Sequence, residues 1–273
     1  MTTAEESVPG YEPMLAAYHR AFAAELREIV HSLPIAKGQT VLDMACGDGA
    51  YSHWLAECVG ADGRVVAVDN NAGCLEIARR ASCSFYNIEF LRAPIDSLPF
   101  EDETFDLCWC AQSLYSLPDP VEALRRLFRV TKPGGIVAVL ESDTLHHVIL
   151  PWPVELELSV RAAELRDLAE KTETPRKFYV GRQLRSVFRK AGFEDITMQT
   201  LAYDRAAPLG PHEHTYFSEY LKDLLKRYAK HLDGPIRRGF ELTADGQSNE
   251  FLLNDPDLTA TCIDQLASGR KPR

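Results

Sequence analysis

The sequence predicts a doubly wound α/β fold, in which parallel strands alternate with helices. Three observations carry this prediction. A buried apolar strand at 39–44 ends near an acid, passes through a turn with two glycines and enters a helix at 50–59. A second buried strand at 64–69 again ends on an acid, and strand and helix patterns keep alternating up to residue 141. In a sheet of this kind, ligands bind at the carboxyl ends of the parallel strands.

Hydrophobic periodicity indicates the order of the elements. The expected strands are 39–44, 64–69, 88–92, 105–110, 136–141, 196–201 and 258–263, and the expected helices are 13–33, 50–59, 72–82, 119–130, 154–171, 181–192 and 213–232. We interpret residues 1–273 as a single domain, with an N-terminal lid helix in 11–33. The insertions 142–178 and 204–256 follow strands five and six. We therefore expect them to lie over the carboxyl edge of the sheet and form a substrate cap.

The residues of the turn after the first strand distinguish between two classes of ligand, a dinucleotide and a cationic ligand without phosphate. Dinucleotide-binding folds place glycines in a G-x-G-x-x-G pattern, with the pyrophosphate on the following helix. The corresponding positions here are Ala45, Gly47 and Ala50, so two of the three glycines are missing. Asp43 stands at the end of the strand, where its charge would repel a pyrophosphate and where a buried carboxylate needs a partner. The turn therefore favours a cationic ligand without phosphate.

Four motifs in order carry a family resemblance. They are Asp43-x-Ala45-x-Gly47-x-Gly49, the strand ending in Asp69, Leu98-Pro99-Phe100 followed by the strand 105–110, and the segment 127–135 that ends in Lys-Pro-Gly-Gly. Over residues 38–141 the chain resembles the class I S-adenosylmethionine-dependent methyltransferases of the small-molecule type, with alanine at the first glycine. The resemblance implies a Rossmann-like seven-stranded methyltransferase sheet of order 3-2-1-4-5-7-6 with helical lid insertions, in which strand seven lies antiparallel beside strand six.

The resemblance also implies which residues hold S-adenosyl-L-methionine. The glycine turn would contact the methionyl part, Asp43 would orient the turn or the ammonium group, and Asp69 would hold the ribose. Proline occupies position 94, where the family often has an aspartate for adenine, so the backbone near Ile95 or the Asp96 side chain would take over that contact. The expected cofactor-binding residues are Tyr18, Asp43, Ala45, Gly47, Gly49, Asp69, Asn70, Ile95, Ala111 and Gln112.

The acceptor side offers fewer signals. His146 and His147 open the first insertion, and histidine is the usual proton acceptor near neutral pH. Together with Tyr115 they are the candidate catalytic residues, although both histidines as ordinary solvated loop residues stay an open alternative. Aromatic residues that could line an apolar or ring-bearing acceptor pocket are Tyr115, Trp152, Tyr216, Phe217 and Tyr220.

The function implied is methyl transfer to a small or medium-sized organic acceptor, with O-, N- and C-methylation not distinguished. Two alternatives remain: a catalytically silent S-adenosylmethionine-binding scaffold, and an NAD-dependent enzyme, which the missing glycines disfavour. The net charge of −10 argues against nucleic acid and anionic membranes as partners. No segment reaches membrane-spanning length.

The seven cysteines are scattered and show no zinc-ligand spacing, so we expect reduced thiols, no metal site and a cytoplasmic protein. A homodimer stays open.

Overall fold

The computed structural model describes residues 12–142, 147–171 and 180–273. Its helices are α1 (Glu12–Ala21), α2 (Ala23–Ser32), α3 (Ala50–Val59), α4 (Ala72–Ala81), α5 (Pro120–Val130), α6 (Val154–Lys171), α7 (Val180–Ala191), α8 (Pro211–Tyr228) and α9 (Gly234–Ala244). Its strands are β1 (Thr40–Met44), β2 (Arg64–Asp69), β3 (Ile88–Arg92), β4 (Phe105–Ala111), β5 (Thr131–Ser142), β6 (Val148–Ile149), β7 (Glu194–Ala206) and β8 (Thr259–Arg270).

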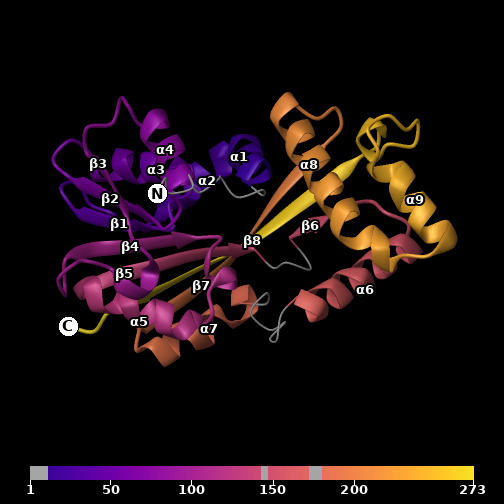
Figure 1. Cartoon of the computed structure of the whole chain (residues 1–273). Coiled ribbons are helices and arrows are strands. Elements are labelled where there is room, and N and C mark those ends of the chain that lie inside the picture. Colours follow the sequence, from indigo (N-terminus) through magenta and orange to yellow (C-terminus); the bar gives the residue numbers. More distant parts are fainter. Residues whose placement is uncertain (1–11, 143–146, 172–179) are drawn as a thin grey trace, which may run out of the picture.

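The strands form one eight-stranded sheet (Figure 1). Its order is β3-β2-β1-β4-β5-β8, with β7 on the far side of β8 and the two-residue β6 beside the start of β8. The strands β3, β2, β1, β4 and β5 are parallel, whereas β8 runs antiparallel to both β5 and β7. Expected strands six and seven are β7 and β8, so the predicted order and the antiparallel pairing are confirmed. The additional strand is β6.

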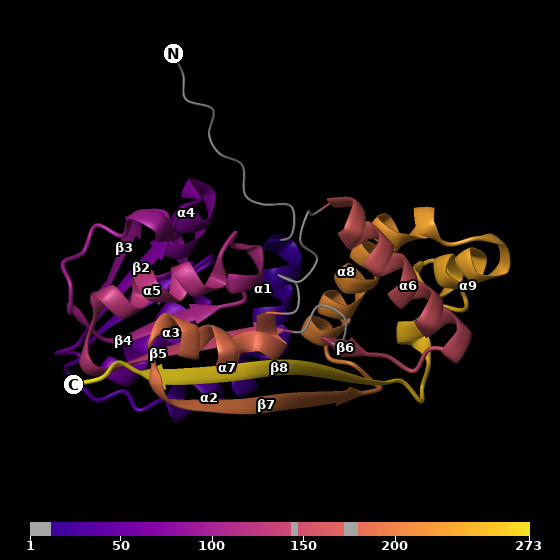
Figure 2. The ribbon, with the colours of Figure 1, turned by 90° about the horizontal axis from the view of Figure 1, so that it is seen from below.

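Helices cover both faces of the sheet because its central strands are apolar on both sides, as parallel strands require. Val41 and Trp109 belong to the core beneath α2 and α3, whereas Leu42 and Cys108, one residue along each strand, pack into the core beneath α5 and α7. This alternation follows the two-residue period of a strand. Figure 2 shows α7 over the long β7–β8 ribbon, which continues beyond the core toward α8 and α9.

The N-terminal helix departs from the prediction of one helix over 13–33. It breaks at Phe22, which separates α1 from α2 and has φ −119° and ψ 22°. The Arg205 side chain, on β7, donates from Nη2 to the Ala21 carbonyl at 2.9 Å and places its guanidinium 4.5 Å from the centre of the Phe22 ring. These contacts, from a residue far along the chain, hold the break in place.

Other boundaries also differ from the expected ones, and the strand expected at 196–201 is β7, which spans Glu194–Ala206. The helix expected at 213–232 is α8 followed by a short 3-10 turn at Ala229–His231. The strand expected at 258–263 continues to Arg270, because its second half pairs with both β5 and β7. The strand expected at 136–141 already begins at Thr131, and its pairing with β4 shifts register between Phe105 and Leu107.

The insertions contribute the helices α6, α8 and α9, which pack against one another beyond the carboxyl end of the parallel strands (Figures 1 and 2). Helix α8 also packs along α1. The seven cysteines are free thiols, and among the described helices none is long and apolar enough to cross a membrane.

Candidate active site

The turn between β1 and α3 is held in left-handed backbone conformations. Ala45, Gly47 and Gly49 have φ of 60°, 54° and 84°. The Cys46 N–H donates to the Val68 carbonyl at 3.0 Å, which anchors the turn to the end of β2. Gly49 lies so close to α4 that a Cβ there would come within 3.0 Å of the Ala78 Cβ. The turn therefore presents bare backbone at the carboxyl edge of the sheet, and alanine at position 45 tolerates a conformation that glycine adopts more easily.

Asp69 connects this turn to the end of β2. Its Oδ2 accepts a hydrogen bond from the Gly47 N–H at 3.0 Å, and its Oδ1 accepts one from the Asn71 N–H at 2.8 Å. The side chain is 8% exposed. Each carboxylate oxygen can accept a second hydrogen bond, so Asp69 can hold two hydroxyl groups of a ligand while it keeps the turn in position.

Asp43 lies buried beneath the turn, at the end of β1. The Ser52 hydroxyl donates to its Oδ2 at 2.5 Å. Burial raises the pKa of Asp43 to about 7, and the hydrogen bond from Ser52 opposes this rise. A cationic group in the turn would favour the ionised carboxylate.

An ion pair that the sequence did not reveal connects α1 to the turn. Nδ1 of the buried His19 lies 3.1 Å from both carboxylate oxygens of Asp48. Burial alone would raise the pKa of Asp48, but His19 and the hydrogen bond from the Ala50 N–H lower it overall. This contact holds helix α1 beside the glycine turn.

A cavity of about 370 Å³ opens beside the ends of β4 and β5, between α1, α6 and α8. Four of the sequence-predicted residues meet in its wall: Tyr18, Gln112, Tyr115 and His147. The predicted aromatic residues Tyr216 and Tyr220 also line it. The lining residues are Met14, Leu15, Tyr18, Gln112, Tyr115, Glu141, Ser142, His147, Glu164, Leu168, Tyr216, Tyr220, Asp223, Leu224 and Arg227.

The other candidate residues lie elsewhere. Trp152 packs its ring against Phe240, with 5.7 Å between the centroids, and Phe217 is fully buried against Phe22. The Ile95 side chain is buried in the core under α5, so only its backbone can face a ligand. His146 lies outside the described residues.

Asp264, in β8, is a buried acid that sequence reasoning missed. Its carboxylate accepts hydrogen bonds from the Tyr18 hydroxyl and from the Ser142 hydroxyl, and Nδ1 of His147 lies 3.7 Å from its Oδ1. His147 Nε2 is 3.0 Å from the Tyr216 hydroxyl. Burial and the neighbouring Asp264 raise the pKa of Tyr18, so its phenol stays protonated.

Glu141, at the end of β5, is a second buried acid that was missed. Its Oε1 accepts hydrogen bonds from the Ser113 and Leu114 N–H groups at 2.9 and 2.6 Å. Burial raises the pKa of Glu141 to about 8, although these two hydrogen bonds lower it. The sequence does contain a signal for both residues, because each is an acid within an otherwise apolar strand. Burying a carboxyl group there is costly unless it has hydrogen-bond partners, so such a residue indicates a buried polar site.

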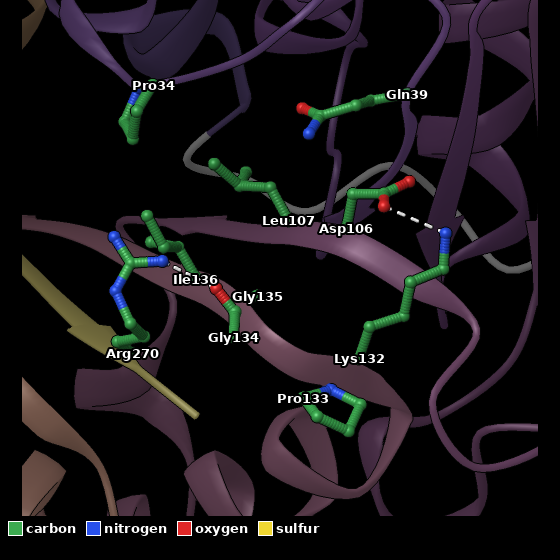
Figure 3. A pocket seen from close by; sticks show the side chains of 10 residues that line it. All are labelled: Pro34, Gln39, Asp106, Leu107, Lys132, Pro133, Gly134, Gly135, Ile136 and Arg270. Carbon is green, nitrogen blue, oxygen red and sulfur yellow. Dashed lines mark hydrogen bonds and ion pairs between the residues drawn. The ribbon is translucent and has the colours of Figure 1, made fainter. Parts of the chain in front are cut away.

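A smaller cavity lies at the opposite edge of the sheet, where β1, β4 and β5 begin (Figure 3). Lys132 and Asp106 form an ion pair there at 2.8 Å, and Arg270 donates to the Gly134 carbonyl. Ligands of doubly wound sheets bind at the carboxyl ends of the strands, so this cavity is on the wrong edge for the cofactor.

Comparison with known proteins identifies the family. The profile of the ubiE/COQ5 methyltransferase family matches residues 16–208, which is more than half of the chain. The chain belongs to the ubiE/COQ5 methyltransferase family. It is thus an S-adenosylmethionine-dependent methyltransferase that acts on a small organic molecule, which decides against NAD as the cofactor.

Relatives of this ubiE/COQ5 chain include two demethylmenaquinone methyltransferases. That of Geobacillus stearothermophilus is 27% identical over 191 residues, which cover 66% of this chain and 82% of the relative. That of Lactococcus lactis subsp. lactis is 33% identical over 175 residues, 59% of this chain and 68% of the relative.

Solved structures share the fold. The YcgJ protein from Bacillus subtilis has a TM-score of 0.57 at 17% identity, covering 92% of this chain and 99% of that one. Phosphoethanolamine N-methyltransferase 2 of Haemonchus contortus, in complex with S-adenosyl-L-methionine, has a TM-score of 0.55 at 16% identity, covering 96% of this chain and 57% of that one.

The residues at the glycine turn fit S-adenosylmethionine. The backbone is bare at Gly47 and Gly49, a buried carboxyl group stands at Asp43, and Asp69 retains hydrogen-bonding capacity at the end of β2. The ubiE/COQ5 match ends at residue 208, before α8 begins. Tyr216, Tyr220 and Arg227, which line the cavity, therefore lie outside the part that identifies the family.

Proposed function

We propose that the chain methylates an uncharged, ring-bearing acceptor that carries an ionisable hydroxyl group. The observation that carries this proposal is the composition of the cavity wall, where Tyr18, Tyr115, Tyr216 and Tyr220 surround His147. Aromatic side chains contribute apolar area and offset or edge-on contacts with a ring. The relatives' names, demethylmenaquinone methyltransferase, agree with a ring-bearing acceptor.

The charged side chains that line the cavity favour an uncharged acceptor. Among the lining residues, Arg227 is the sole lysine or arginine, and its Nη2 forms an ion pair with Asp223 at 2.6 Å. Glu164 is paired in the same way with Arg161 at 3.2 Å. Among the described lining residues, a phosphate-bearing acceptor would therefore meet acids and a single arginine that is already paired with Asp223, and burying an uncompensated anion is costly.

On the cofactor side, the proposed contacts follow the turn and the strand ends. The backbone of Ala45, Gly47 and Gly49 contacts the methionyl part, and Asp43 faces its ammonium group. Asp69, with the neighbouring Asn70, holds the ribose hydroxyls. When bound, S-adenosylmethionine supplies an electrophilic methyl carbon.

The remaining contacts lie around the other parts of the cofactor. The backbone near Ile95 faces the adenine, and the backbone of Ala111 and Gln112 flanks the sulfonium end. Tyr18, in α1, closes over this region.

We assign the proton transfer to His147. Nδ1 lies 3.5 Å from the Ile263 carbonyl and 3.7 Å from Asp264, which favours the tautomer with the proton on Nδ1. Nε2 is then free to accept a proton and lies 3.0 Å from the Tyr216 hydroxyl. The acceptor's hydroxyl proton passes to Nε2, directly or through Tyr216, which makes the acceptor a nucleophile. S-adenosylmethionine would supply the methyl group, whose bond to sulfur would break as the new bond forms, and S-adenosylhomocysteine would leave.

The test is a methyl-transfer assay with S-adenosylmethionine and three acceptors: 1,4-naphthoquinol, catechol and phosphoethanolamine, with products identified by mass spectrometry. We expect methylation of a hydroxylated ring and none of phosphoethanolamine. His147→Asn should lower kcat about 100-fold or more, the usual contribution of a general base. The matched control is His212→Asn, an exposed histidine on α8. Methylation of phosphoethanolamine alone would refute the acceptor class, and an unchanged His147→Asn variant would refute the base.

Sedimentation equilibrium of the same samples tests whether two copies associate. A homodimer stays a prediction.

A further inference from the structure

We infer that Gln112 and Glu141 together recognise one hydroxyl group of the acceptor, with Glu141 donating a hydrogen bond to it and Gln112 accepting one from it. The inference rests on the proposed function, because it assigns a specificity role within the same cavity. Both side chains line the cavity, from the ends of the neighbouring strands β4 and β5.

Glu141 is oriented by backbone groups of residues 113–115, and the Tyr115 backbone also acts on its carboxyl group. Its Oε1 accepts hydrogen bonds from the Ser113 and Leu114 N–H groups. Its Oε2 is buried and makes no hydrogen bond within the part of the chain that the structure describes. Leaving a buried polar atom without a partner costs free energy, so this oxygen is set up for a ligand group.

Gln112 is held in an unusual conformation that fixes its position. Its φ is 50°, and its N–H donates to the Leu140 carbonyl at 2.7 Å, which ties it to the residue before Glu141. The Gln112 Oε1 is also buried without a hydrogen-bond partner among the described residues. Two unsatisfied oxygens thus stand at the ends of adjacent strands and line the same cavity.

The two oxygens differ in what they offer. Burial raises the pKa of Glu141 to about 8, so this carboxyl group holds a proton at neutral pH. The proton belongs on Oε2, because Oε1 already faces two N–H donors. Glu141 therefore presents a donor, whereas the amide oxygen of Gln112 presents an acceptor. A hydroxyl group satisfies both at once, whereas a methyl ether or a carbonyl oxygen satisfies only the donor.

The test compares two ligands that differ in the hydroxyl protons. Binding of 1,4-naphthoquinol and of 1,4-dimethoxynaphthalene is measured by calorimetry, without oxygen and with saturating S-adenosylhomocysteine so that no turnover occurs. We expect the quinol to bind the unmodified protein at least about tenfold more tightly, as one hydrogen bond to a buried group provides. Gln112→Met, similar in size but without the amide oxygen, should reduce this preference by about tenfold, the contribution of one hydrogen bond, and leave the affinity for the ether unchanged. Gln199→Met makes the same change on the exposed side of β7 and should preserve the preference.

Glu141 is tested with a pair of variants. Glu141→Met removes the donor and should weaken quinol binding, and it also removes the acceptor for two backbone N–H groups. Glu141→Gln keeps an acceptor for those groups and a donor at the Oε2 position, so it should bind the quinol more tightly than Glu141→Met. Because the ether oxygen also accepts from Glu141, both ligands should lose affinity in Glu141→Met, whereas naphthalene, which has no oxygen, should not. A merely structural role would lower the affinity for naphthalene as well.

Three results would overturn the inference. Equal affinities for quinol and ether would show that the hydroxyl is not recognised, although a ring-bearing acceptor would still stand. The Gln112→Met variant could instead lose affinity for S-adenosylhomocysteine and keep the preference for the quinol. This result would show that the Gln112 side chain binds the cofactor and not the acceptor. Failure of both ligands to bind a protein that binds S-adenosylhomocysteine would refute the proposed acceptor class as well.

Discussion

Gly49 offers a sharp test of the glycine turn, because a second glycine in the chain has nearly the same positive φ. Gly49 has φ +84° and lies against α4, where a Cβ would be 3.0 Å from the Ala78 Cβ. Gly38 has φ +83°, and a Cβ there would meet nothing within 4 Å. Alanine at either position pays the same backbone cost, whereas only Gly49→Ala also forces the turn away from α4.

The magnitudes follow from these two terms. The left-handed conformation costs an L-residue about 1–2 kcal/mol, which is the expected loss of unfolding free energy for Gly38→Ala. Overpacking costs about 1–3 kcal/mol more, so Gly49→Ala should lose about 2–5 kcal/mol. Adding Ala78→Gly removes the contact at a helix cost of about 1 kcal/mol, so the double variant should be more stable than the sum of the single effects.

Urea denaturation followed by circular dichroism measures these differences, provided that the m-value stays constant. The affinity for S-adenosylhomocysteine should also fall in Gly49→Ala and stay unchanged in Gly38→Ala. Equal destabilisation of the two variants would refute the close approach to Ala78. Strict additivity with Ala78→Gly would refute it as well.

Three further predictions concern the same end of the sheet. Ala45→Gly relieves the strain of φ 60° and should raise the unfolding free energy by about 1 kcal/mol in the same assay, and a loss of stability would contradict this. The pKa of Asp43 is raised from 3.8 to about 7, so the folded state keeps a proton that the unfolded state releases. Stability should therefore fall as pH rises between these values, by at most about 1.4 kcal/mol per pH unit, and Asp43→Asn should remove that part of the slope; identical pH profiles would exclude it. Asp69→Asn places an amide N–H₂ against a backbone N–H, so it should cost about 1–3 kcal/mol of stability and at least about tenfold in cofactor affinity, whereas the exposed Asp62→Asn should change neither.

The parallel half of the sheet was predictable because its signals are local. Helix α3 matches the expected range, and β1 and α4 differ from theirs by a single residue. The break at Phe22 was not predictable, since residues 13–33 keep one helical period and the contacts that hold the break come from Arg205. The length of β8 was missed for a similar reason, because its second half depends on pairing with two other strands.

The candidate site also has a part that could be predicted from the sequence and a part that could not. Asp43, the glycines and Asp69 belong to a continuous motif with its own spacing, so sequence alone placed them at the carboxyl edge. The cavity that we propose for the acceptor combines α1, the ends of β4 and β5, and α8, which are far apart in the chain. His147 was a candidate because of its residue type, and its catalytic role stays a prediction. Asp264 was not a candidate, because its contacts depend on Tyr18 and Ser142 meeting it across three elements.

The position of α8 and α9 in the chain has a consequence for engineering. They lie between β7 and β8, which pair up to Ala206 and Thr259, and the Ala207 N–H donates to the Leu258 carbonyl at 3.0 Å. Residues 208–257 thus form a very long hairpin loop, whose ends are held together by the sheet. Halving such a loop changes its closure entropy by only about 0.6 kcal/mol. Because α8 packs along α1 and buries Phe217 against Phe22, a segment of different length grafted between these two strands would have to keep this apolar face of α8.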